Sequence, residues 1–223
     1  MKIKNIALAA VVLGLVCSLC ACGGTKIQYN GDDGSYTDKK GNEYLHAPSA
    51  YEPVSYESEK AFGKLTAGIG EFELYQIAGA GEGEWLTTQD GDVLYLNSVK
   101  LPTLQEFGTD RVYVCQEGER IHAFATITKE AEINELLEVY LNGESIPYPS
   151  RVASQSLRLR FASDEYPFLY YRLTYLEYAS DVILYTTDAD GNEIEVNYGK
   201  YFIYNRDEGR CVPAGELVHR YAE

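Results

Sequence analysis

Residues 111–128, RVYVCQEGERIHAFATIT, together with residues 129–143, KEAEINELLEVYLNG, predict a pair of strands followed by a helix. Apolar and polar residues alternate on both sides of Glu117-Gly118, which favours a tight hairpin turn at that point. A two-residue turn places Cys115 opposite Arg120 and gives the pair one apolar face. That face would consist of Val112, Val114, Ile121, Ala123, Ala125 and Ile127. We therefore expect the two strands to contribute one stripe of the protein core.

The segment after this hairpin has the spacing of an amphipathic helix. Thr128 is a suitable N-cap, and Glu130 and Glu132 fall in the first turn, where the helix dipole favours acidic side chains. Asn142-Gly143 supplies a stop signal. Apolar residues recur at intervals of three and four, at Ile133, Leu136, Leu137, Tyr140 and Leu141. These features predict a helix over about residues 129–141.

Most of the remaining chain is typical of strands and turns. Alternating or continuous apolar runs that favour strands lie at residues 71–77, 157–161 and 168–178. A short helix is expected near residues 216–221. We therefore predict an α+β fold, built as a mainly antiparallel β-sheet with one packed amphipathic helix (about 129–141) and a short C-terminal helix. Its single domain would span residues 36–223.

Tyrosine is unusually frequent, with 20 residues in the chain. Between Phe168 and Tyr178, aromatic side chains occupy both faces of the expected strand. A central strand that is buried on both sides explains this pattern. The alternative is an exposed tyrosine platform that contacts a protein or a sugar.

A local group of arginines is the second unusual feature. Arg158 and Arg160 alternate with apolar residues, so they share the outer face of their strand if Leu159 faces the core. They either pair with carboxylates of this same chain or form a docking site for an acidic partner. The candidate partner surface consists of Arg158, Arg160, Tyr170 and Arg172.

Cys115 and Cys211 are the only cysteines beyond the N-terminal region. In an oxidising compartment they could form one disulfide, and the alternative is two separately buried thiols. The predicted hairpin also places His122 on the same face as Cys115, which suggests a thiolate nucleophile with a histidine base. No third residue that would orient the histidine is identifiable, so we favour surface or packing roles and assign no catalytic residue.

Metal and cofactor signatures are missing from the sequence. His46, His122 and His219 are too widely spaced for a zinc motif. The segment 188–193 resembles a calcium loop only in part, because its glycine arrives too early, so we interpret it as a hairpin turn. There is no phosphate loop, dinucleotide fingerprint or nucleophile elbow. We expect no metal and no cofactor, and the net charge of −15 disfavours nucleic acid as a partner.

The N-terminus carries a targeting signal. Lys2 and Lys4 precede an apolar run of 11 residues, Ile6 to Val16, which is too short to cross a bilayer and is typical of a signal-peptide core. Leu19-Cys20-Ala21-Cys22 follows and resembles the lipobox of bacterial lipoproteins. The resemblance implies removal of residues 1–21 and attachment of lipid to the thiol of Cys22.

This resemblance is limited to residues 1–24, and it implies an extracytoplasmic protein anchored by lipid to a bacterial cell membrane. Residues 22–35 are rich in glycine and aspartate and are predicted to form a flexible linker. We expect a non-catalytic binding or accessory lipoprotein whose partner is an envelope protein or glycan. One alternative is an inhibitor or immunity-type lipoprotein that binds a basic toxin or protease. The other is an envelope hydrolase or transferase with an unrecognised site.

Overall fold

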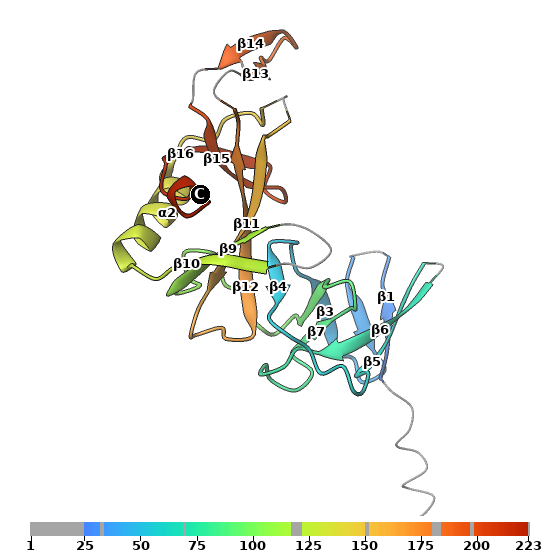
Figure 1. Cartoon of the computed structure of the whole chain (residues 1–223). Helices are drawn as coiled ribbons and strands as arrows, with labels where there is room; N and C mark the ends of the chain where they lie inside the picture. Colours follow the sequence, from blue (N-terminus) through green and yellow to red (C-terminus); the bar gives the residue numbers. More distant parts are fainter. Residues whose placement is uncertain are drawn as a thin grey trace, which may run out of the picture.

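The computed structural model describes residues 25–31, 34–68, 70–116, 122–149, 152–179, 184–196 and 199–222. In this part of the chain 45% of the residues lie in strands and 9% in helices. A closed barrel lies beside a second, open sheet (Figure 1). The prediction of an α+β fold is therefore wrong, and the protein is mainly β. The prediction failed because the strands of the barrel are short and leave little periodic signal.

The barrel consists of seven strands in the order β1-β2-β3-β8-β7-β6-β5, closed by a parallel pairing of β1 with β5. Its strands are β1 (Thr25–Tyr29), β2 (Tyr36–Asp38), β3 (Glu43–His46), β5 (Gly63–Ala67), β6 (Gly70–Gln76), β7 (Trp85–Thr87) and β8 (Val93–Leu96). Buried side chains form its core, namely Ile27, Tyr44, Leu65, Leu74, Leu86 and Leu94. Small barrels of this kind hold side chains in their interior.

The first strand of the barrel lies in the segment that was predicted to be a linker. The prediction for residues 22–35 is wrong for Thr25–Tyr29, which pair with β2 and β5. Ile27 supplies the driving force, because its side chain is completely buried in the barrel. A Cβ at Gly63 would lie 2.1 Å from the carbonyl oxygen of Thr25, so glycine is required for this close approach. One apolar residue in a polar segment is a weak sequence signal.

The larger sheet has the strand order β10-β9-β11-β12-β15-β16, and β4 pairs with β12. Its strands are β4 (Tyr51–Pro53), β9 (Arg111–Gln116), β10 (His122–Ile127), β11 (Gln155–Ala162), β12 (Leu169–Glu177), β15 (Tyr201–Asn205) and β16 (Arg210–Ala214). All pairings in this sheet are antiparallel. β12 is central, because β11 lies along one edge while β4 and β15 share the other.

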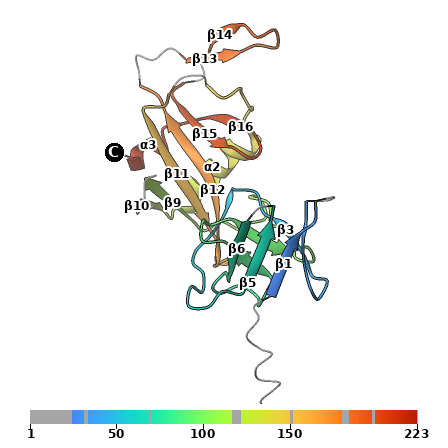
Figure 2. The ribbon, with the colours of Figure 1, turned by 90° about the vertical axis from the view of Figure 1, so that its right-hand side faces the viewer.

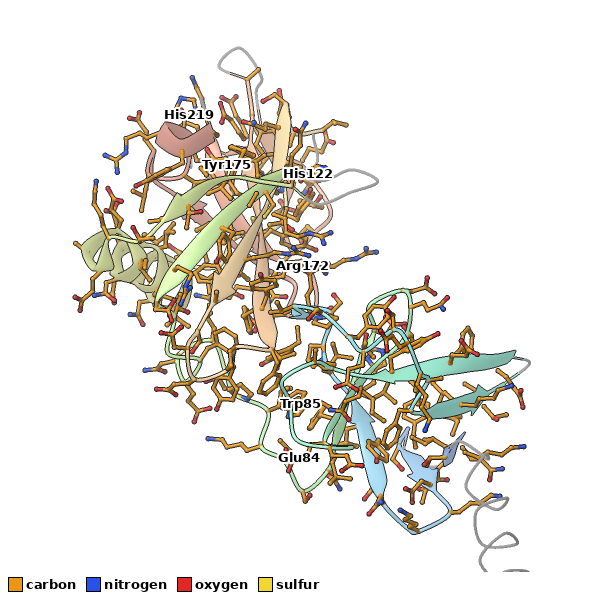
Figure 3. The ribbon with its side chains drawn as sticks, turned by 60° about the horizontal axis from the view of Figure 1, so that its bottom comes forward. Glu84, Trp85, His122, Arg172, Tyr175 and His219 are labelled. Carbon is orange, nitrogen blue, oxygen red and sulfur yellow. The ribbon has the colours of Figure 1, made fainter. Side chains whose placement is uncertain are left out.

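Two helices occur in the described residues, α2 (Glu130–Asn142) and α3 (His219–Ala222). The helix expected at about 129–141 is therefore present, and it buries Ile133, Leu136 and Tyr140. These side chains share one core with sheet residues that include Val112, Leu159, Phe161, Leu173 and Tyr175. The core continues to the barrel through Trp85 (Figure 3). Its ring centroid lies 5.6 Å from that of Phe168.

The register of β9 and β10 differs from the predicted hairpin. His122 lies opposite Gln116, and Ala123 lies opposite Cys115. Five residues separate the two strands; they include the predicted turn at Glu117-Gly118 and lie outside the described residues. A longer connection changes which residues face the core, and the predicted stripe is correct only in part. Its buried members among the described residues are Val112, Val114 and Ile127.

A small hairpin of β13 (Leu184–Thr187) and β14 (Glu193–Val196) forms a separate two-stranded sheet. It lies at the end of the molecule opposite the barrel (Figure 2). The backbone nitrogens of Asp190 and Asn192 donate to the carboxylate of Asp188, at 3.0 and 2.8 Å. Segment 188–193 is thus a hairpin turn, as the sequence indicated.

Candidate functional site

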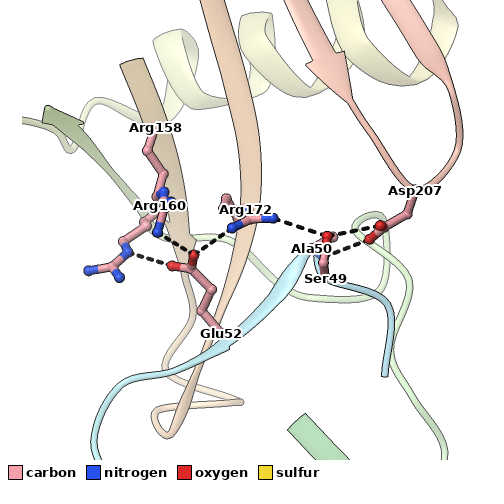
Figure 4. Close-up of polar contacts among 7 residues, drawn as sticks. All are labelled: Ser49, Ala50, Glu52, Arg158, Arg160, Arg172 and Asp207. Carbon is pink, nitrogen blue, oxygen red and sulfur yellow. Dashed lines mark hydrogen bonds and ion pairs between the residues drawn. The ribbon is translucent and has the colours of Figure 1, made fainter. Parts of the chain in front are cut away.

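The carboxylate of Glu52 contacts three arginine side chains on the face of the larger sheet that is opposite α2 (Figure 4). Glu52 Oε1 accepts hydrogen bonds from Arg158 Nη1 at 2.6 Å and from Arg172 Nη1 at 3.1 Å. Glu52 Oε2 accepts one from Arg160 Nε at 2.7 Å. The four side chains are 11–25% exposed, so these charge-assisted hydrogen bonds are partly shielded from water.

The strand register brings this cluster together. Arg160 on β11 lies directly opposite Arg172 on β12, and Glu52 on β4 lies opposite Tyr170. Like charges directly across a strand pair repel each other. Glu52 offsets that repulsion, since its carboxylate contacts both guanidinium groups. Alternation along β11 sends Leu159 into the core on the other face.

A second carboxylate extends the network towards β15 and β16. Arg172 Nη2 donates to Ser49 Oγ at 3.0 Å, and Ser49 Oγ donates to Asp207 Oδ1 at 2.8 Å. The backbone nitrogen of Ala50 donates to Asp207 Oδ2 at 2.8 Å. The segment before β4 is thereby fixed to the β15–β16 turn, and the guanidinium of Arg172 is held at two of its nitrogens.

Arg160 is oriented by aromatic rings as well as by Glu52. Because it contacts Glu52 through Nε, its terminal amino groups point away from the carboxylate (Figure 4). Its guanidinium carbon lies 5.0 Å from the ring centroid of Tyr170, and the ring of Tyr113 packs edge-on against Tyr170 at 5.9 Å. Burial is the largest cause of the raised pKa of Tyr170, so the ring stays uncharged near neutral pH.

A cavity of about 330 Å³ lies between the arginines and one end of the barrel. Glu52 and the three arginines line it on the side of the sheet. His46, at the end of β3, lines the side of the barrel together with Asp90 and Asp92 in the turn between β7 and β8. His46 Nε2 lies 3.9 Å from Asp92 Oδ1. The volume is at the lower end of the range for small-molecule pockets.

Positive charge outnumbers negative charge around Glu52. Three positive charges meet one negative charge in a chain whose net charge is −15. Together the three guanidinium groups and Glu52 give the sheet side of the cavity a locally positive character.

The structure brings together all four residues of the candidate partner surface, Arg158, Arg160, Tyr170 and Arg172. The interpretation in which the arginines pair with a carboxylate of the same chain is confirmed by Glu52. Sequence reasoning missed Glu52, which lies 106 residues before Arg158. Its one local signal was an acidic residue inside the short apolar segment 51–54.

The tyrosines of β12 do not form an exposed platform. Tyr171 and Tyr175 on β12 are at most 4% exposed, and so is Tyr178, which directly follows the strand. The interpretation of β12 as a central strand is therefore confirmed, but only one of its faces is fully buried, because Tyr170, Arg172 and Thr174 on the other face are partly exposed. No exposed tyrosine platform forms on this strand. Arg172 lies on the part of the sheet nearest the barrel, whereas Tyr175 and His219 lie farther from it (Figure 3).

The two cysteines are free, buried thiols. The two cysteines lie at opposite ends of a row of residues that pair across neighbouring strands. The row runs from Cys115 through Arg158, Thr174 and Tyr204 to Cys211. Four interstrand spacings of ~4.8 Å separate them by roughly 19 Å, whereas a disulfide requires Cα atoms within about 7 Å. The disulfide is therefore excluded, and the alternative of two separate buried thiols is correct.

The pairing of Cys115 with His122 as a catalytic dyad is also wrong. Ala123 lies opposite Cys115, so the side chain of His122 projects from the other face of the strand pair. Burial is the largest cause of the raised pKa of the Cys115 thiol, which opposes formation of a nucleophilic thiolate.

Neither a metal centre nor a membrane-spanning helix is found in the part of the chain that the structure describes. No group of three or more His, Cys, Asp or Glu in that part is placed to hold a metal ion. None of its helices has the length and apolar character needed to cross a membrane. The expected signal peptide and Cys22 lie outside the described residues.

Comparisons with known proteins do not identify a family. No protein-family model, curated protein or solved structure matches the chain.

Proposed function

We propose that this protein is a lipid-anchored, extracytoplasmic binding module without catalysis, and that its ligand presents an anionic group to the arginine cluster. The observation that carries the proposal is the convergence of Arg158, Arg160 and Arg172 on one carboxylate at the wall of a cavity. The anionic group can belong to a small molecule or to a side chain of a partner protein.

The proposed anchor rests on the N-terminal sequence. An apolar run of 11 residues followed by Leu19-Cys20-Ala21-Cys22 is similar to the processing site of bacterial lipoproteins. Two or more acyl chains on one residue hold a protein at a membrane durably, whereas a single chain is marginal. Mass spectrometry of protein from the native host is expected to find an acylated N-terminus at Cys22. An intact N-terminal Met1 would contradict the anchor.

Anion binding follows from the chemistry of the guanidinium groups. The planar fork of arginine matches the geometry of carboxylate and phosphate. The terminal amino groups of Arg160 point away from Glu52, and Arg160 lines the cavity (Figure 4). Tyr170 and Ser49 hold two of the arginines in place before any ligand arrives. This preorganisation reduces the entropy that binding would cost.

Isothermal titration calorimetry with citrate tests anion binding. We expect saturable binding that weakens with salt and is reduced at least about tenfold in Arg160→Gln, since the loss of a charge-assisted contact costs about 1.5 kcal/mol or more. Arg206→Gln is the matched control, because Arg206 is exposed and does not line the cavity. Equal affinity of the two variants for citrate would contradict the proposed site.

A second candidate, capture of a basic protein, is favoured by the β13–β14 hairpin. Residues 184–196 contain no basic residue. Four of them are acidic, namely Asp188, Asp190, Glu193 and Glu195. Such a surface accelerates association with a cationic partner by long-range attraction. The association rate with a short polylysine probe is expected to fall in Glu193→Gln/Glu195→Gln and to fall steeply with salt. An unchanged rate would remove this candidate.

A further inference from the structure

The two sides of the cavity carry opposite charge. The sheet side presents Arg160 and Arg172, while the barrel side presents Asp90 and Asp92. Both aspartates are exposed, and they flank Gly91 in a turn whose backbone is fixed by the hydrogen bond from Asp92 N to Thr88 Oγ1 at 3.2 Å. Asp92 Oδ1 lies 3.9 Å from His46 Nε2, and this is the contact found for the two carboxylates among the described residues. The two carboxylates are therefore available to a ligand.

We propose that the ligand of this cavity is zwitterionic, with a carboxylate that contacts Arg160 and Arg172 and a protonated amine that contacts the Asp90–Asp92 turn. This inference rests on the proposed anion-binding function and adds the class of ligand. A free amino acid or a short peptide with a free amino terminus has this chemistry.

Charge opposition inside one cavity discriminates between ligands. A ligand that carries only negative charge gains the arginine contacts but meets Asp90 and Asp92 across the cavity. A ligand with an amine at its other end converts that repulsion into attraction, because an opposite charge at the same distance reverses the sign of the interaction. The volume of about 330 Å³ limits the occupant to a small molecule or a few residues of a chain.

The carboxylate and the amine have different local environments. The arginines on the sheet side are 17–25% exposed, and aromatic packing on Tyr170 and the contact with Ser49 fix them further. The aspartates lie on the more open side, where solvent screens charge more strongly. We therefore expect the carboxylate to contribute most of the affinity and the amine to contribute selectivity.

Three matched peptides separate these contributions. Triglycine carries both charges, N-acetyl-triglycine keeps only the carboxylate, and triglycinamide keeps only the amine. Calorimetry with the intact protein is expected to show triglycine binding about fivefold more tightly than N-acetyl-triglycine, as one solvent-accessible ion pair would give. Triglycinamide is expected to bind more weakly than either.

The variant Asp90→Asn/Asp92→Asn is expected to erase the preference for triglycine while it keeps the binding of N-acetyl-triglycine. Asp190→Asn/Glu193→Gln makes the same change in net charge on the distant β13–β14 hairpin and is expected to keep the preference. Equal affinity of the native protein for triglycine and N-acetyl-triglycine would contradict the proposal of a zwitterionic ligand. It would not contradict the proposed anion-binding site. Failure of citrate and both carboxylate peptides to bind would overturn the proposed function itself.

Discussion

The two faces of the larger sheet are stabilised in different ways although the same strands form both. One face buries Leu159, Phe161 and Leu173 in a continuous apolar core, while the other holds three arginines around Glu52. Apolar burial is spread over many contacts and has little directionality. The polar face depends on one carboxylate, whose removal leaves several cations uncompensated. Alternate residues of β11 and β12 therefore contribute the apolar core on one face and the arginine cluster, our proposed binding site, on the other.

The largest effect is expected on the apolar face. Phe161 is completely buried in the core that the sheet shares with α2, so Phe161→Ala removes a full side chain and leaves a cavity. We expect the free energy of unfolding to fall by about 4 kcal/mol. Urea denaturation followed by circular dichroism measures this loss. A change below about 1 kcal/mol would show that this face is not the main source of stability.

Loss of the central carboxylate is expected to have the next largest effect. Glu52→Gln leaves the three arginines with a neutral partner, and we expect the free energy of unfolding to fall by about 3 kcal/mol, since breaking a buried ionic network strands its charges. Citrate is expected to restore part of this stability, because an added anion replaces the lost charge. Glu71→Gln is the control, since Glu71 contacts Lys64 in an exposed pair. If both variants lose equal stability, the network around Glu52 has no special role.

High pH provides a smaller and reversible test of the apolar face. Burial is the largest cause of the raised pKa values of Tyr171 and Tyr175, which lie above the ordinary value of 10.0. The stability that these neutral hydroxyls contribute is fully present below about pH 10, and it is lost as the pH rises towards their folded-state pKa values. Ultraviolet absorbance is expected to show their ionisation together with loss of the fold. Exposed tyrosines ionise near pH 10 in any case, so the outcome that would contradict burial is ionisation of all 20 tyrosines at pH 10 in a protein that stays folded.

The smallest effect is expected from an ion pair outside both faces. Lys64 and Glu71 are about half exposed and lie 3.4 Å apart on the barrel. Lys64→Gln should lower the free energy of unfolding by less than about 1 kcal/mol, because solvent screens this pair. Denaturation at two salt concentrations measures it. A loss as large as that of Glu52→Gln would mean that burial does not distinguish the two sets of charges.

The sequence predicted those elements whose pattern is local. The spacing of Ile133, Leu136 and Tyr140 located α2, and the aromatic run of residues 168–178 located the central strand. The alternation around Arg158 and Arg160 correctly placed both on the face opposite the core. In each of these cases one short segment contains the whole signal.

The barrel and the centre of the site could not be predicted in this way. Strands of three residues such as β2 and β7 carry too few side chains for a periodic signal. Glu52 reaches the arginines only because β4 pairs with β12, a contact between residues more than a hundred positions apart. The register of β9 and β10 was missed because it depends on the length of their connection, which the turn residues alone did not reveal.

The position of β1 has a consequence for how the protein meets its surroundings. Its first residue, Thr25, is only three positions after Cys22, and three peptide units reach at most about 10 Å. If Cys22 carries lipid, the first strand of the barrel begins within about 10 Å of the attachment point, and so close to the lipid headgroups. The proposed site between the barrel and the larger sheet would then be held near the bilayer by a short connection and not by a long flexible linker.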